Sequence, residues 1–196
     1  MRGVLLKCLG ITGTPGTGKK TLAREFEPIL HYKIVNINSL CISKGAVLGK
    51  DKYGLIANIN KLRVIVKKEI DKNGSIIVGH LLSYVLSPKN IDLSIVLRCD
   101  PYILEQRLNA RGYPEKKVLM NVGAEILGSC YFHTVKKMGK SKVHVIDNST
   151  RKPEETLVEA LKAVNEGVRY DGSDIDWLGL VRERGDLGRF FPDSYY

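Results

Sequence analysis

Short apolar runs alternate with helix-like segments along most of the chain. Five runs are rich in valine, isoleucine and leucine, and they read as buried strands. These runs are Val4–Thr12, Lys33–Ile37, Ser75–Val78, Leu93–Leu97 and Lys142–Ile146. The segments Thr21–Leu30 and Lys61–Ile70 have the apolar spacing of helices, while Pro101 and Pro153 are placed to open two more.

Strands that are separated by helices connect through right-handed crossovers and pair in parallel. The sequence therefore predicts an α/β fold, with a five-stranded parallel sheet and helices on both faces. We expect one domain over residues 1–166. Residues 167–196 contain two glycine–aspartate turns and the aromatic end RFFPDSYY. This segment is expected either to pack on the domain as an extension or to bind a partner.

The stretch GTPGTGKKT, residues 13–21, joins the first predicted strand to the first predicted helix. Its glycines allow backbone angles that turn successive N–H groups onto phosphate oxygens. The helix behind the loop adds its positive end, and Lys19 can reach the β and γ phosphates. Because a strand precedes the loop and a helix follows it, we predict a nucleotide-phosphate site rather than a glycine-rich turn without a ligand.

Charge is distributed unevenly along the chain. The formal net charge is +10, but residues 170–196 carry six acidic and only three basic side chains, so the positive surplus lies in the first 169 residues. Such a surplus suits polyanions, either nucleotide phosphates or RNA. It is also compatible with a basic surface that has no polyanionic partner.

The bulk composition is that of a globular chain, with 43% hydrophobic and 27% charged residues among 196. The four cysteines are scattered, without a C-x-x-C pair, so we expect free thiols in a reducing cytoplasm. No apolar window is long enough to span a bilayer, and the N-terminal run is too short for a convincing signal peptide. We therefore expect a cytoplasmic protein without a membrane partner.

Three motifs occur in a specific order: TGTPGTGKKTLA, then RLNARGYPEKK, then STRKPEE. In these motifs the chain resembles the archaeal proteins named putative adenylate kinase, which belong with the adenylate kinase 6 family, over residues 4 to about 165. The resemblance implies a P-loop nucleoside monophosphate kinase fold with a lid. It also implies that ATP and AMP react to give two ADP, and that a small-subunit ribosomal protein and rRNA are partners in small-subunit maturation.

The resemblance also assigns residues by position. Contacts to ATP would fall on Gly16, Gly18, Lys19, Lys20 and Thr21. The lid would be about 110–120, with Arg111 on the phosphates, and Lys152 would lie beside the adenine. The monophosphate-binding region would be about 36–57. His80 matches the histidine of a second catalytic signature, so Lys19, His80 and Arg111 are the expected catalytic residues.

Elementary chemistry supports, in part, the assignments of Arg111 and of the lid. Phosphoryl transfer needs charge neutralisation and exclusion of water, and Arg107 and Arg111, four residues apart, would project from one face of a helix. Gly112 would then free the chain to close. A lone histidine after a buried strand is often a structural hydrogen-bond donor. For His80, a structural role and a role in positioning water or phosphate therefore both stay open.

Two positions depart from the family pattern where magnesium ligands are expected. Lys20 stands in place of a hydroxyl residue and Val78 in place of an aspartate. Thr21 cannot substitute for the hydroxyl, because one helical step rotates a side chain by about 100°. Lys20 either replaces magnesium in part as a fixed counter-charge or extends into solvent. ATP is thus the expected cofactor, the magnesium requirement is open, and no protein metal ligand is expected.

A third departure concerns the acceptor nucleotide. Residues 57–60 read Ala-Asn-Ile-Asn where the family has acidic residues, so acceptor choice stays open. The leading prediction is a nucleoside monophosphate kinase with weak turnover. The alternative is a ribosome assembly factor controlled by its nucleotide state, with ATPase activity only or with no catalysis.

Overall fold

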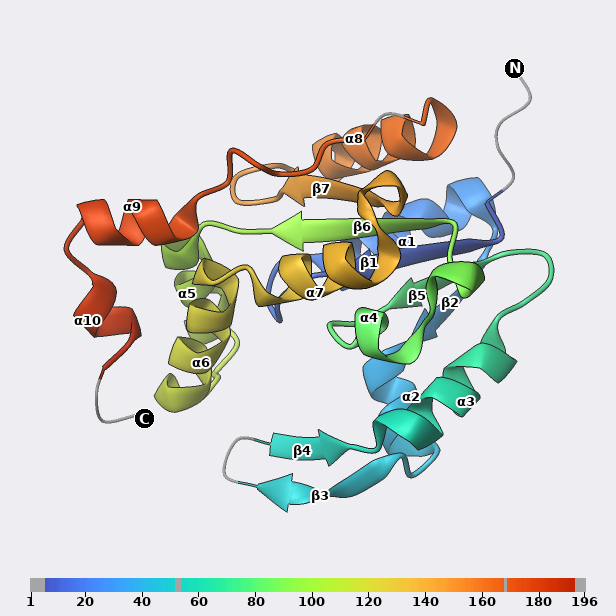
Figure 1. Ribbon diagram of the computed structural model, residues 1–196, viewed down its shortest axis with the longest axis horizontal. Helices are drawn as coiled ribbons and strands as arrows, with labels where there is room; N and C mark the ends of the chain where they lie inside the picture. The colour runs from blue at the N-terminus through green and yellow to red at the C-terminus, as the bar shows by residue number, and fades with distance from the viewer. Residues whose placement is uncertain (1–5, 52–53, 168, 193–196) are drawn as a thin grey trace.

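The central element is a five-stranded parallel sheet with the strand order β2-β5-β1-β6-β7 (Figure 1). The computed structural model describes residues 6–51, 54–167 and 169–192. The strands are β1 (Cys8–Thr12), β2 (Lys33–Asn36), β5 (Ser75–Val78), β6 (Leu93–Arg98) and β7 (Val143–Asp147). All five predicted strands are confirmed. The first prediction began at Val4, which lies outside the described residues, and β1 starts at Cys8.

Helices cover both faces of the sheet, as expected. On one face lie α1 (Lys19–Leu30) and α8 (Pro153–Asn165), and on the other lie α3 (Ile59–Glu69), α4 (Leu82–Val85) and α7 (Ser129–Met138). Successive side chains along each strand point to opposite faces of the sheet, so each strand contributes to the hydrophobic core on both faces. Ile76 and Val78 pack on the α1 side, whereas Ile77 packs on the opposite side. This arrangement confirms the predicted α/β fold, with a five-stranded parallel sheet and helices on both faces.

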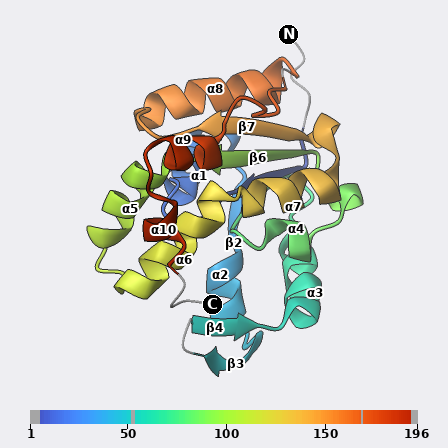
Figure 2. The same cartoon turned by 60° about the vertical axis from the view of Figure 1, so that its left-hand side comes forward.

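A separate lobe follows β2 and extends away from the sheet (Figures 1 and 2). It contains α2 (Ile37–Ser43) and an antiparallel hairpin of β3 (Val47–Asp51) and β4 (Gly54–Ala57). The expected monophosphate-binding region falls on this lobe, apart from residues 52–53, which lie outside the described residues. The predicted extension of the second strand to Ile37 is wrong, because the Asn36 side chain accepts the Ser39 N–H at 3.0 Å and so caps α2.

A helical subdomain lies at the carboxyl edge of the sheet (Figure 2). It combines α5 (Pro101–Asn109) and α6 (Glu115–Ile126) with the C-terminal helices α9 (Trp177–Glu183) and α10 (Leu187–Phe190). Val181 and Phe190 share a core with Leu104 and Val122. The described part of the expected extension therefore packs on the domain, while residues 168 and 193–196 lie outside the described residues.

The cysteines match the expectation of free thiols. Cys8, Cys41 and Cys99 are buried, Cys130 is partly buried, and all four are free.

Two single turns of 3₁₀ helix, Pro88–Asn90 and Lys140–Lys142, precede β6 and β7. In the described part of the chain, no helix combines the length and apolarity that a membrane crossing requires.

Candidate nucleotide-phosphate site

The glycine loop connects the carboxyl end of β1 to the first turn of α1. Gly16 and Gly18 have φ angles of 100° and 101°, which side-chain-bearing residues rarely adopt. A Cβ atom on Gly18 would also lie 2.5 Å from Nδ2 of Asn148, which follows β7. That amide group donates to the Thr17 carbonyl oxygen at 2.9 Å. Glycine at position 18 thus allows the β7 end to hold the loop from one side.

Lys19 is the first residue of α1, and its ammonium group folds back over the loop. Its Nζ donates to the Thr14 carbonyl oxygen at 2.7 Å. Burial lowers the pKa of Lys19 to about 8. Cys130 and Glu125 oppose this shift, whereas the neighbouring cations of Arg111 and Lys20 add to it. Several cations therefore converge on the loop at close range.

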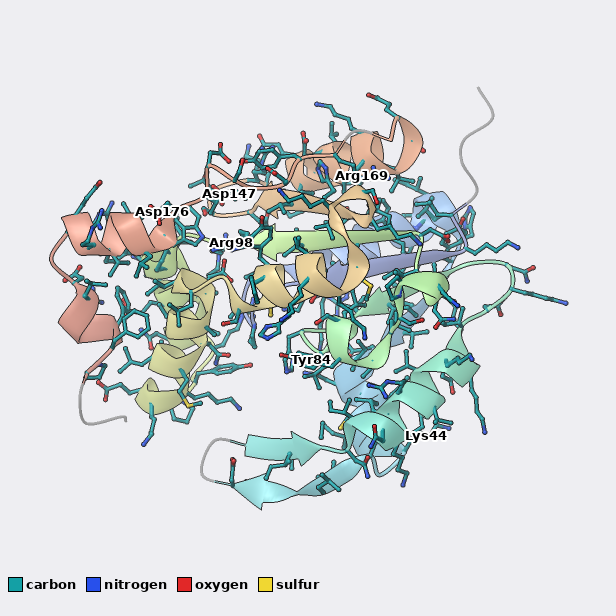
Figure 3. The ribbon with its side chains drawn as sticks, viewed as in Figure 1. Lys44, Tyr84, Arg98, Asp147, Arg169 and Asp176 are labelled. Atoms are coloured by element: carbon teal, nitrogen blue, oxygen red, sulfur yellow. The ribbon has the colours of Figure 1, made fainter. Side chains whose placement is uncertain are left out.

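A buried ion pair supports the loop from beneath. Arg98 projects from the end of β6 (Figure 3), and its Nε donates to Glu125 of α6 at 2.7 Å. Glu125 also accepts from the Thr14 hydroxyl at 2.5 Å and from the Cys99 N–H at 3.1 Å. Burial raises the pKa of Glu125 above its ordinary value, and the Arg98 guanidinium opposes this shift only in part. Both carboxylate oxygens of Glu125 accept hydrogen bonds and Glu125 lines neither hollow of the site, so its role is to position the loop.

The loop borders a cavity of about 290 Å³, and residues from four stretches of the chain line it. The expected site residues gathered around it are Gly16, Gly18, Lys19, Lys20, Thr21, His80 and Arg111. Asn36, Asn38 and Arg24 also line the cavity, and sequence reasoning missed them. Of these three residues, only Arg24 could have been expected from the sequence, because it lies one helical turn beyond Lys20. The structure thus brings the expected residues together, while their roles stay predictions.

A second hollow of about 270 Å³ adjoins the first, and Arg111 lines both. Arg107 lines it too, but its guanidinium donates to the carbonyl oxygens of Asn148 and Ser149 at 3.0 and 2.7 Å. Arg107 therefore fixes the loop after β7. Since α5 ends at Asn109, Arg111 lies beyond the helix on which we expected it.

Lys152 is not among the residues that line either hollow. It is exposed at the start of α8, where its backbone N–H donates to the Glu155 carboxylate at 2.9 Å. Its neighbours Arg151 and Pro153 line the second hollow instead. The segment expected near the adenine therefore borders the site through Arg151 and Pro153, and not through Lys152.

His80 follows β5 and lines the first cavity. Burial lowers its pKa to about 4, and the cations of Lys19 and Lys117 add to the shift. The imidazole is therefore neutral at neutral pH, so it can hydrogen-bond to water or phosphate but does not contribute a positive charge. Lys117 of α6 is a cation that sequence reasoning missed. A Cβ atom on Gly54 would lie 3.8 Å from its Nζ, so the tip of the β3–β4 hairpin approaches α6.

The residues at the loop do not fit a protein-coordinated magnesium ion. P-loop NTPases hold this ion with the hydroxyl residue after the loop lysine and an aspartate on a nearby strand. Lys20 follows the loop lysine, and the resemblance implies that Val78 stands in place of the aspartate. The residues lining the two hollows include no carboxylate. Within residues 6–51, 54–167 and 169–192, no cluster of three or more His, Cys, Asp or Glu side chains could hold a metal.

A parallel sheet whose first strand leads into a glycine loop and a lysine-bearing helix defines a P-loop fold. The AAA domain family matches residues 9–128. The chain is 32% identical over 176 residues to "Putative adenylate kinase" of Pyrococcus abyssi, covering 89% of this chain and 93% of that protein. The protein of the same name from Pyrobaculum aerophilum is 36% identical over 185 residues, covering 90% and 89%. The chain belongs to the AAA domain family and to the archaeal family whose members are named putative adenylate kinase.

Solved structures show the same fold at low sequence identity. A gluconokinase from Sinorhizobium meliloti 1021 matches with a TM-score of 0.55 and 16% identity, covering 82% of this chain and 92% of that one. A shikimate kinase from Bacteroides thetaiotaomicron matches with a TM-score of 0.52 and 14% identity, covering 80% and 96%. These likenesses show that the fold extends over most of the chain.

Proposed function

We propose that this protein is an ATP-binding nucleoside monophosphate kinase that converts ATP and AMP into two ADP. The observation that carries the proposal is the convergence of Lys19, Lys20 and Arg111 on one cavity at the glycine loop. The names of its archaeal relatives support adenine nucleotides as substrates. ATP is the proposed cofactor, and AMP is the proposed acceptor.

In this reaction a phosphate oxygen of AMP attacks the γ phosphorus of ATP. The bond from that phosphorus to the β–γ bridging oxygen breaks, and ADP leaves. The protein supplies position and positive charge, because such a transfer needs little covalent help. Lys19 would bind the β and γ phosphates and Arg111 the transferred group, while neutral His80 would donate or accept one hydrogen bond.

The two adjoining hollows provide separate space for the donor and the acceptor. The second hollow lies between Arg107, Arg111 and the start of α8, where the nucleoside of ATP would fit. Asn36 and Asn38 border the first cavity on the side of the lobe, where AMP would approach. Because carboxylates are missing from the lining of both hollows, we expect slow turnover.

A coupled assay tests this proposal. ADP formation and release of inorganic phosphate are measured from ATP, with and without AMP. A kinase forms ADP only when AMP is present and releases no phosphate, and Lys19→Ala abolishes the reaction and weakens ATP binding strongly. Phosphate release that is independent of AMP would contradict kinase activity and indicate an ATPase.

A second candidate function is that of a small-subunit assembly factor controlled by its nucleotide state. It is favoured by the net charge of +10 and by the poor fit to magnesium, which limits catalysis more than it limits binding. Its partners would be a small-subunit ribosomal protein and rRNA. In this case ATP would act as a ligand that changes the protein's affinity for those partners.

A further inference from the structure

Two cations on α1 face the phosphate cavity where a P-loop protein would have its metal ligand. Lys20 and Arg24 are four residues apart, so they lie on one face of the helix. Both line the cavity at the glycine loop, and both line a smaller hollow of about 260 Å³ beside β2. Among the described residues, neither side chain has a recorded ion pair or hydrogen bond. Their charges are therefore available to a ligand.

The charge of Lys20 acts directly on the loop. Burial is the main cause of the lowered pKa of Lys19, and the cations of Arg111 and Lys20 lower it further, so these cations lie close enough to repel one another. Such repulsion is relieved when a polyanion binds among them. A divalent cation placed beside Lys20 would instead experience repulsion from a like charge.

The strand beside α1 offers no compensating negative charge. Val78 is only 2% exposed and packs in the core between the sheet and α1, yet it borders both hollows that Lys20 lines. Glu27 lines the smaller hollow but not the cavity at the glycine loop. An ion in that cavity would meet phosphates, water and neutral side-chain oxygens such as those of Thr21, Asn36 and Asn38, but no carboxylate.

We propose that Lys20, assisted by Arg24, serves as the fixed counter-charge of the β and γ phosphates, so that the site binds a nucleoside triphosphate without a divalent metal. The inference rests on the proposed function, because it takes this cavity as the triphosphate site. An ammonium group tethered at the start of α1 supplies a positive charge and up to three N–H donors. It adds to the charges of Lys19 and Arg111, which suits the highly charged triphosphate.

Calorimetry with two probes tests the proposal. ATP and inorganic tripolyphosphate are titrated into the full chain, once in EDTA and once in excess magnesium chloride. For the wild type we expect affinity in EDTA to equal or exceed affinity in magnesium. Lys20→Met keeps the length of the side chain but removes its charge, so it should weaken binding in EDTA by about tenfold or more. In magnesium the same substitution should have a smaller effect.

The reverse design restores the usual donor set. In Lys20→Thr/Val78→Asp, magnesium should strengthen ATP binding by about tenfold or more. Lys67→Met is the matched control, since Lys67 is exposed on α3 and lines neither hollow. It should change neither affinity nor metal dependence. Thermal melting of each variant checks folding, and Lys20→Met alone decides the result if the double variant does not fold.

Two results would overturn the inference. One is a wild-type protein for which magnesium strengthens ATP binding about tenfold, with Lys20→Met unchanged in EDTA. The other is a wild type that binds neither probe in EDTA. If both probes bind without metal but ATP and AMP yield no ADP, the proposed kinase function fails while this inference stands.

Discussion

Lys19 shows how the chemistry of one residue depends on its surroundings. The glycine loop motif predicts that this side chain meets phosphate, and the structure places it at the cavity. Its proton affinity, however, is set by burial and by neighbours from other elements. With a pKa of about 8, the group is mostly charged at pH 7 and mostly neutral at pH 9.

Binding of ATP should therefore be linked to proton uptake at Lys19. The phosphates favour the charged ammonium, so they raise its pKa, and the complex then holds a proton that the free protein lacks above about pH 8. We expect uptake to be small at pH 7 and to approach one proton near pH 9. Affinity should fall by up to about tenfold per pH unit above pH 8.

Calorimetry in two buffers of different ionisation enthalpy measures this uptake. Lys19→Arg is the control, because a guanidinium stays charged over the same range. Its complex with ATP should take up no proton at this position. A wild type that takes up no proton near pH 9 would show that Lys19 is already charged before ATP binds.

At the scale of elements, the turn between α5 and α6 is the candidate lid. The expected lid, about 110–120, comprises this turn and the first half of α6. Gly112 in the turn has a φ of 69°, and a Cβ atom there would meet nothing within 4 Å. Arg111 has no recorded partner among the described residues, whereas Arg107 is tied to the loop after β7. Arg111 is thus the arginine able to follow a closing turn.

Arg111→Ala should lower the catalytic rate more than it weakens ATP binding. Guanidinium groups of this kind meet charge that develops on the transferred phosphoryl group, so we expect a loss of about 100-fold in kcat. Steady-state kinetics and calorimetry give the two quantities separately. The control is Arg182→Ala on α9, an exposed arginine that lines neither hollow. If Arg111→Ala weakened ATP binding but left kcat unchanged, the assignment of Arg111 to the lid would be wrong.

At the scale of the whole molecule, charge and topology act together. The sheet order places the glycine loop between β5 and β6, so residues after each of these strands reach it. The acidic C-terminal segment lies against α5 and α6, which leaves the basic surplus to the rest of the domain.

If the assembly role holds, RNA binding should be strongly dependent on salt. Each phosphate neutralised by a lysine or arginine releases counter-ions, so affinity falls as salt rises. Fluorescence anisotropy with a small-subunit rRNA fragment should show tight binding at low salt and a steep loss between about 50 and 200 mM salt. ATP should change this affinity. Absence of binding at low salt would count against the ribosomal role.

The hairpin of β3 and β4 could not be predicted from the pattern of apolar and polar residues. Its strands β3 and β4 are short, and Leu48, Leu55 and Ile56 are exposed although they are apolar. A strand without a buried face has no clear alternation to detect. The lobe was located only through the family resemblance, and its hairpin was not predicted.

The sequence by itself determined the order of the central strands along the chain and the glycine loop, whereas the replacement of both magnesium ligands is what the family resemblance implies. These features are local, because strand-forming runs, glycine angles and residue identities need no distant contact. Tertiary structure decided which side chains are available. Glu125 could not be found from the sequence, since its contacts to Thr14 and Arg98 span 111 and 27 residues. The fold also decided that Arg111 and Lys20 face the cavity, while Arg107 is held by backbone carbonyl groups, because chain segments far apart in sequence meet only when the sheet brings its strand ends together.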